Sequence, residues 1–456
     1  MSLEPEKQKY PVTETEEIEV PDGGYGWVVL IAFFLFNFCT WGANAGYAIY
    51  LNHYLEYDTF AGGTKLDYSA IGGIAFGAGL LFAPLITWFS HKCSVHITIA
   101  IGIVFQGLGL MLAAFSKKLW QLYLTQGLLI SFGLAFIFIP CMTLLPQWFR
   151  KKRSVASGVG TSGSGLGGII FNLAMQRITE LKNVKWALIT QFIICTSLST
   201  LALMLTRTRR DVIFKDKDFK IRIVDKQVFS KSCTWLLCGW ISFTMLGYVI
   251  LLYSLSAFTT SLGYTAKQGS IVSCMISVGN LFGRPVIGHL ADRYGPISVG
   301  VVVHLIVAIF AWAMWIPCKN LATAIVFALI EGALMGTIWP TVGSIAARVV
   351  GLKKLDVTLG LSWLLLAIFS IPAPVIGLKL RTDQDGGKAY VNTAIFAGFG
   401  YFGAALCLFL LRGYIIARDR ESSLEGIMDQ DELDVKVTPK QFLKALFVLR
   451  STQRKV

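Results

Sequence analysis

The sequence predicts an all-α membrane protein with twelve transmembrane helices arranged as two halves of six. Three observations support this fold class. The 456 residues are 54% hydrophobic and 15% charged, and their mean hydropathy of +0.61 is typical of integral membrane proteins. The apolar residues fall in successive stretches of about 20, which is the length that crosses a bilayer of about 30 Å. The longest internal polar segment, residues 207–231, divides these stretches six and six.

Each apolar stretch is expected to be a helix, because a span in lipid must satisfy its own backbone hydrogen bonds. The runs are continuously apolar rather than alternating, which excludes a barrel. The expected spans are residues 26–50, 68–90, 95–115, 119–147, 154–176, 185–206, 232–260, 267–291, 297–317, 321–349, 357–380 and 390–417.

Lysine and arginine are distributed unevenly around these spans. The largest clusters, at residues 150–153, at 207–231 and after 412, lie on the side of both termini. By the positive-inside rule this side is cytosolic, and the membrane is the plasma membrane or an organelle membrane such as that of the vacuole. Topology thus accounts for the net charge of +14, and no polar segment is large enough for a nucleic-acid-binding domain.

The expected organisation is a cytosolic N-terminal arm (1–24), a first six-helix half (25–206), a cytosolic linker (207–231), a second half (232–417) and a cytosolic tail (418–456). The halves share a faint repeat, in which the segment around Pro84 in span 2 aligns with the segment around Pro285 in span 8. Repeated halves favour a transporter that rocks around a binding site between them.

Metal, cofactor and catalytic motifs are missing from the sequence. The nine cysteines fall mostly inside spans, without CxxC or Cys/His metal spacing, and read as small apolar packing residues. There is no GxxxxGK[ST] phosphate loop and no pattern of nucleophile and base. We therefore expect no cofactor, no metal and no enzyme activity.

Arg284 is the most informative residue, because it interrupts the apolar run of span 8. On a helix it lies eight residues, or roughly 12 Å, from Asp292 at the end of the span. An arginine at that depth costs at least about 2.5–3.5 kcal/mol, so such residues normally face a cavity or a partner. The two interpretations are binding of an anionic substrate group and a permanent ion pair within the protein.

Three motifs together resemble the monocarboxylate-transporter family of the major facilitator superfamily. They are the stretch from Pro21 to Trp27 before span 1, the stretch from Trp148 to Gly158 with the glycines that follow it in span 5, and the stretch from Asn280 to Pro296. The resemblance covers residues 22–417 and is closest to the yeast monocarboxylate-permease homologues. It implies a twelve-helix secondary transporter that works by alternating access.

The chain departs from the family pattern at two charged positions. Family members that carry protons with lactate have an aspartate four residues before the span 8 arginine, where this chain has Asn280, and a lysine late in span 1, where it has Ala45 beside Asn44. Lactate or pyruvate symport with protons by the usual mechanism is therefore not expected. Arg284, Asn280 and Asn44 are the substrate-binding candidates.

Glu331 is the one carboxylate deep within an expected span, about ten residues into span 10. In this superfamily spans 8 and 10 border the same central cavity, so Glu331 is a candidate counter-ion for Arg284 and a candidate proton carrier. The alternative is a structural glutamate.

Four residues are gating candidates: Asp22 in the turn before span 1, and Gly288, Asp292 and Arg293 at the end of span 8. For the turn that contains Asp22, the alternative is an ordinary anchor where the chain enters the membrane. Asp292 and Arg293 are expected to act as a gate latch that pairs with a helix end or a charge in the cytosol-facing state, and the alternative is a solvated loop pair of little energy. The matching turn after span 2 lacks an acidic residue, so the sequence predicts a one-sided latch.

The sequence thus predicts a secondary transporter for a small organic solute, with an anion favoured by Arg284. The expected partners are that solute, protons as a candidate co-substrate, and the lipid bilayer. The main alternative is a nutrient sensor built on a transporter fold without net transport.

Overall fold

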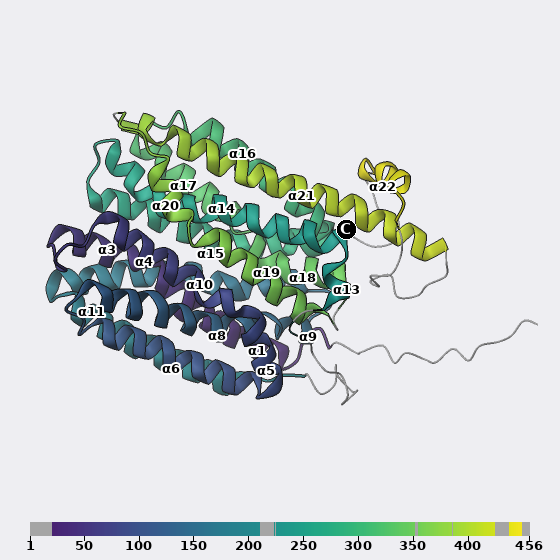
Figure 1. Cartoon of the computed structure of the whole chain (residues 1–456), viewed down its shortest axis with the longest axis horizontal. Helices are drawn as coiled ribbons and strands as arrows, with labels where there is room; N and C mark the ends of the chain where they lie inside the picture. Colours follow the sequence, from purple (N-terminus) through teal and green to yellow (C-terminus); the bar gives the residue numbers. More distant parts are fainter. Residues whose placement is uncertain are drawn as a thin grey trace, which may run out of the picture.

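A computed structural model describes residues 21–209, 223, 225–351, 354–384, 386–424 and 437–448, which form a bundle of helices with no strand among them (Figure 1). The predicted all-α fold class is confirmed. Most of the N-terminal arm, much of the linker and part of the tail lie outside the described residues.

The first half consists of segments that join end to end into long, partly irregular helices. They are α1 (Gly26–Asn37), the π-helical segment η1 (Phe38–Gly42), α2 (Ala43–Ala45), α3 (Tyr47–Glu56), α4 (Lys65–Gly77), the 3-10 segment η2 (Gly79–Phe82), α5 (Ala83–Lys92), α6 (Val95–Ala113), α7 (Leu119–Leu122), the π-helical segment η3 (Tyr123–Leu129), α8 (Ile130–Met142), α9 (Leu145–Trp148), α10 (Arg153–Leu181) and α11 (Val184–Leu205).

The second half follows the same plan after the short helix α13 (Lys226–Phe229). Its segments are α14 (Ser232–Ser261), α15 (Ala266–Tyr294), α16 (Pro296–Phe310), the π-helical segment η4 (Ala311–Trp315), α17 (Leu321–Met335), α18 (Ile338–Val350), α19 (Leu355–Ser370), α20 (Ala373–Lys379), the 3-10 segment η5 (Gly386–Tyr390) and α21 (Val391–Leu424). A last short helix, α22 (Pro439–Leu446), packs against α21.

Within the described residues, eleven helices are long and apolar enough to cross a membrane, and they coincide with eleven of the expected spans. The remaining expected span is α10, a helix of 29 residues that is rich in glycine and serine and therefore less apolar. It lies inside the bundle against α1 and α15. The glycines permit this position: a Cβ atom at Gly165 would lie 2.6 Å from the backbone nitrogen of Leu281 on α15.

The described ends of the chain lie at the same end of the bundle, as an even number of spans requires (Figure 1). We call this end the terminal face. The ends of α5, α11, α15 and α18 lie there too, together with the starts of α10 and α19. The other end, the opposite face, carries the connections α3–α4, α14–α15 and α20–η5.

Candidate functional site

A cavity of about 260 Å³ lies between the two halves. Segments α1 to α4 and α10 line it from the first half, and α14, α15, α18, α20 and η5 line it from the second. Its deep end contains Arg284 and Trp339. Its other lining residues include Leu55, Lys65 and Tyr390, which stand where helices end or begin at the opposite face, so the cavity extends from mid-bundle to that face.

Arg284 is 4% exposed and uses its guanidinium to bind uncharged groups. Nη1 donates to the carbonyl of Thr161 and to Oγ of Ser164, both at 2.6 Å, and these residues belong to α10 in the other half. Nε donates to Oδ1 of Asn280 at 3.1 Å, and Nη2 makes a long contact of 3.5 Å with the Tyr248 hydroxyl. In the described part of the chain no carboxylate pairs with it. The arginine is therefore held in position while its charge is left uncompensated.

Asn280 and Asn44 both line the cavity, as does Ala45. Asn280 accepts from Arg284 through its amide oxygen, the role open to a neutral amide four residues before an arginine on a helix. Two features of the site were not recognised in the sequence. Gly336, between α17 and α18, makes room for the guanidinium, because a Cβ there would lie 3.0 Å from Nε of Arg284. Lys65 is a cation that lines the same cavity.

Glu331 does not belong to this site. Its side chain is 1% exposed and does not line the cavity, and neither carboxyl oxygen has a hydrogen-bond partner among the described residues. The structure thus contradicts the hypothesis that Glu331 is the counter-ion of Arg284. The reason is rotation about the helix axis. Gly332 lies on the face of α17 that packs against α15, since a Cβ added there would meet Ile276. Glu331 is the preceding residue and therefore points about 100° away from that face.

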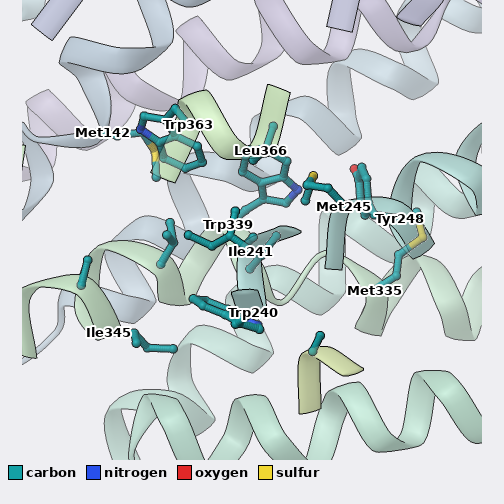
Figure 2. Packing of buried hydrophobic residues seen from close by; sticks show 14 of the residues in the cluster. Met142, Trp240, Ile241, Met245, Tyr248, Met335, Trp339, Ile345, Trp363 and Leu366 are labelled. Carbon is teal, nitrogen blue, oxygen red and sulfur yellow. The ribbon is translucent and has the colours of Figure 1, made fainter. Parts of the chain in front are cut away.

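The base of the cavity is closed toward the terminal face by aromatic rings from both halves. Trp41 of the first half lies 5.8 Å from Trp339 of the second, measured between ring centroids, and Phe138 lies 5.7 Å from Trp339. Trp339 and Trp363 stack at 6.2 Å with their planes 15° apart (Figure 2). We call Trp41, Phe138, Trp339 and Trp363 the aromatic layer.

Beyond the aromatic layer, Asp292 joins the halves at the terminal face. Its carboxylate accepts from the backbone N–H groups of Ser154 at 3.0 Å and Val155 at 2.9 Å, at the start of α10. The predicted pairing with a helix end is therefore present, but in a structure whose cavity extends to the opposite face and not, as expected, to the terminal face. It places a negative charge where the helix dipole favours one. Gly288 lies against the Ser154 carbonyl, where a Cβ would collide. Arg293 is exposed and lies over the neighbouring Tyr294 ring, 5.3 Å from its centroid.

Asp22 makes a comparable contact within the first half. Its carboxylate Oδ1 accepts from the backbone nitrogens of Arg150 at 2.7 Å and Lys151 at 2.8 Å. The chain before α1 is thereby fixed to the connection between α9 and α10, and through it to the segment that Asp292 binds.

The prediction of a one-sided latch is wrong. His91, in the turn after span 2, lies 2.5 Å from Asp356 in the first turn of α19, so a second contact joins the halves at the terminal face. The acidic residue is present, but the second half supplies it across the interface. Asp356 is 265 residues away from His91 in the sequence, so the residues around His91 give no sign of it.

Comparisons with known proteins give a consistent result. The sequence profile described as Major Facilitator Superfamily matches residues 29–374. A protein named "Probable transporter MCH2" from Saccharomyces cerevisiae is 60% identical, over 96% of this chain and 93% of its own length. "Uncharacterized transporter ESBP6" from the same yeast is 29% identical over 90% of this chain and 62% of its own length. "Fujikurins efflux protein" from Gibberella fujikuroi is 25% identical over 83% of this chain and 80% of its own length.

Proposed function

We propose that this chain, which belongs to the Major Facilitator Superfamily and is a secondary transporter, carries a small organic anion by alternating access. It is a multi-pass integral membrane protein, and its family and relatives are transporters rather than enzymes. The resemblance of its motifs to monocarboxylate transporters is part of the proposal. Lactate or pyruvate symport by the usual mechanism is not, because Asn280 and Ala45 stand at two charged positions.

The uncompensated charge of Arg284 is the observation that carries the anion assignment. A buried cation without a partner is costly, and neutral acceptors offset only part of that cost. No aspartate or glutamate is among the described residues that line the cavity. A carboxylate in the cavity supplies the missing charge and matches the planar guanidinium with two parallel hydrogen bonds.

The remaining lining suits the organic body of such an anion. Trp41, Trp339, Tyr248 and Tyr253 present aromatic surface to the cavity, and serine side chains line its walls. Apolar walls with a few polar groups are the usual composition of a small-molecule site. This composition favours a planar or aromatic carboxylate over a short aliphatic one.

The contacts at the terminal face fit a gate. The cavity extends to the opposite face. On the terminal side the halves are joined by three sets of contacts: the aromatic layer, the Asp292 contact with α10 and the His91–Asp356 contact. Alternating access requires these contacts to break when the cavity opens to the terminal face. In this proposal Gly288 allows the close approach at Asp292, and Asp22 holds the segment that Asp292 binds.

Charged residues also support proposals for the orientation of the protein in the membrane and for its coupling to protons. The basic clusters favour a cytosolic terminal face, in the plasma membrane or an organelle membrane such as that of the vacuole. Glu331 remains the proton-coupling candidate, since a buried carboxyl without a hydrogen-bond partner is costly to keep ionised. It would act at a distance from Arg284 rather than as its partner.

Uptake by proteoliposomes tests the anion assignment. The panel contains aliphatic and aromatic carboxylates, each compared with its neutral amide, so that charge is the variable. We expect uptake of at least one carboxylate in preference to its amide, which also excludes a non-transporting sensor. We expect Arg284→Gln to lower that uptake at least about 100-fold, because the bound carboxylate loses its charge partner.

Arg177→Gln is the matched control, since Arg177 is an exposed arginine that pairs with Glu180 on α10, outside the cavity. Preferential uptake of the amides, or full carboxylate uptake by the Arg284→Gln protein, would refute the assignment.

A further inference from the structure

Lys65 stands at the mouth of the cavity, at the opposite end from Arg284. It is the first residue of α4, and its side chain is among the cavity's lining residues. The start of α4 is fixed by a reciprocal cap. Thr64 Oγ1 accepts from the Asp67 backbone nitrogen at 3.3 Å, while Asp67 Oδ2 accepts from the Thr64 backbone nitrogen at 2.9 Å. The cap determines where the lysine enters the cavity wall.

Lys65 makes no ion pair with any described residue. The nearest acidic residue in sequence, Asp67, is occupied by its cap with Thr64 and by the Tyr123 hydroxyl, which donates to Oδ1 at 3.0 Å. Among the described residues, the charge that acts on Lys65 is that of a second cation, Arg381. Arg381 lies 5.6 Å from the centroid of the Tyr390 ring, and Tyr390 also lines the cavity. Two positive charges therefore flank the mouth.

The cavity thus has a cation at its mouth, a cation at its base and no described acidic residue along its lining. A cleft lined by charge of one sign raises the local concentration of ions of the opposite sign and speeds their arrival. Solvent screens charges separated by more than roughly 8–10 Å, so a charge at the base alone acts weakly at the mouth. Lys65 extends the attraction outward to where a solute enters.

We propose that Lys65 forms an outer anion-binding site, where the carboxylate of the substrate binds before it reaches Arg284. The inference rests on the proposed function and names the step that precedes binding at the base. Lys65 is then a positioning residue for capture from the opposite face, and Arg284 retains the binding role at the base.

The reporter for this site is a cysteine at Ser69, which lines the cavity one helical turn after Lys65. Cys93, the exposed native cysteine, is replaced by serine to remove background labelling. The reaction rates of the Ser69→Cys protein with anionic and cationic methanethiosulfonate reagents give a ratio that reports the local charge without knowledge of the substrate. We expect Lys65→Gln to lower the anionic-to-cationic ratio about fivefold, because one unit charge several ångströms away is removed.

Lys117→Gln is the matched control, because Lys117 lies in the connection between α6 and α7 at the same face but outside the cavity lining. It should leave the ratio unchanged, and Lys65→Arg should retain it. A ratio that Lys65→Gln leaves unchanged overturns the inference, whichever solute is transported.

Uptake kinetics supply the second measurement, with the carboxylate that the wild-type protein transports best. Lys65→Gln should raise KM severalfold and weaken its dependence on ionic strength, with little change in kcat, whereas Arg284→Gln lowers uptake at least about 100-fold. Unchanged KM and salt dependence overturn the inference while the proposed function stands. If the wild-type protein transports no carboxylate, the proposed function fails, and the labelling ratio still decides whether Lys65 attracts anions.

Discussion

Replacing Asp292 by asparagine tests the gate at the terminal face most directly. The carboxylate receives the backbone N–H groups of Ser154 and Val155, at 3.0 and 2.9 Å, and it lies half-buried at the start of α10. Asparagine has the same size but presents one oxygen and one NH₂ group. One backbone N–H then faces a donor, and the negative charge at the helix N-terminus is lost.

The magnitude follows from these two losses. A hydrogen bond to a charged group contributes about 1.5–3 kcal/mol, and the helix-dipole interaction adds about 0.3–1 kcal/mol. The terminal-closed state should therefore lose about 2–4 kcal/mol relative to the terminal-open state. Since 1.4 kcal/mol corresponds to a factor of ten, the equilibrium shifts toward the open state by roughly 30–700-fold.

A cross-link across the same interface measures the shift. The hydroxyls of Ser154 and Ser344 lie 2.8 Å apart, from α10 in one half and α18 in the other. A Ser154→Cys, Ser344→Cys protein should form a disulfide in the terminal-closed state, and the disulfide should stop transport until it is reduced. Adding Asp292→Asn should slow cross-linking by at least tenfold.

Arg293→Gln is the control, because Arg293 is exposed and makes its ring contact within its own half. Cross-linking at the unaltered rate in the Asp292→Asn protein, with the disulfide still blocking transport, would refute the reasoning.

Three further predictions concern the site and the second contact. Gly336→Val should raise KM about tenfold or more without preventing insertion, because even a Cβ would lie 3.0 Å from the Arg284 Nε. Gly343→Val on α18 is the control, because a Cβ there would approach only the side chain of Pro146, at 4.0 Å, and an equal effect of both would contradict this. Asp356→Asn should weaken the contact with His91 and favour the terminal-open state, measured by the same cross-link, and faster cross-linking would be the wrong sign. If uptake depends on pH, Glu331→Gln should remove that dependence, and a pH profile that survives the substitution would reject Glu331 as the proton site.

Much of the fold of this protein could be predicted from its sequence, because the bilayer imposes its requirements on each segment separately. A span must be apolar and helical wherever it lies, so the expected spans agree with the helices of the structure to within a few residues at most ends. Arg284 was recognised for the same reason, since its cost depends on depth in the membrane rather than on its neighbours. Asp292 was expected to meet a helix end, and that pairing is present.

The residues that the sequence analysis misplaced or missed are those whose role depends on rotation about a helix axis or on contacts with distant parts of the chain. Glu331 lies on a helix that borders α15, but Gly332 occupies the bordering face. Asp356 completes a contact with His91 across 265 residues. Lys65 belongs to the cavity because α4 begins at its mouth, which no spacing within the sequence indicates.

The sequence alone therefore determined the fold class, the spans, their division into two sets of six and the presence of a cation deep within span 8. These properties follow from the transfer of each segment into lipid, a free energy that sums over neighbouring residues. The tertiary structure decided which residues share the cavity, that Arg284 has neutral partners, and that the terminal face is closed by contacts from both halves. Those properties depend on how helices distant in the sequence rotate and pack against one another, and hydropathy carries no information about that arrangement.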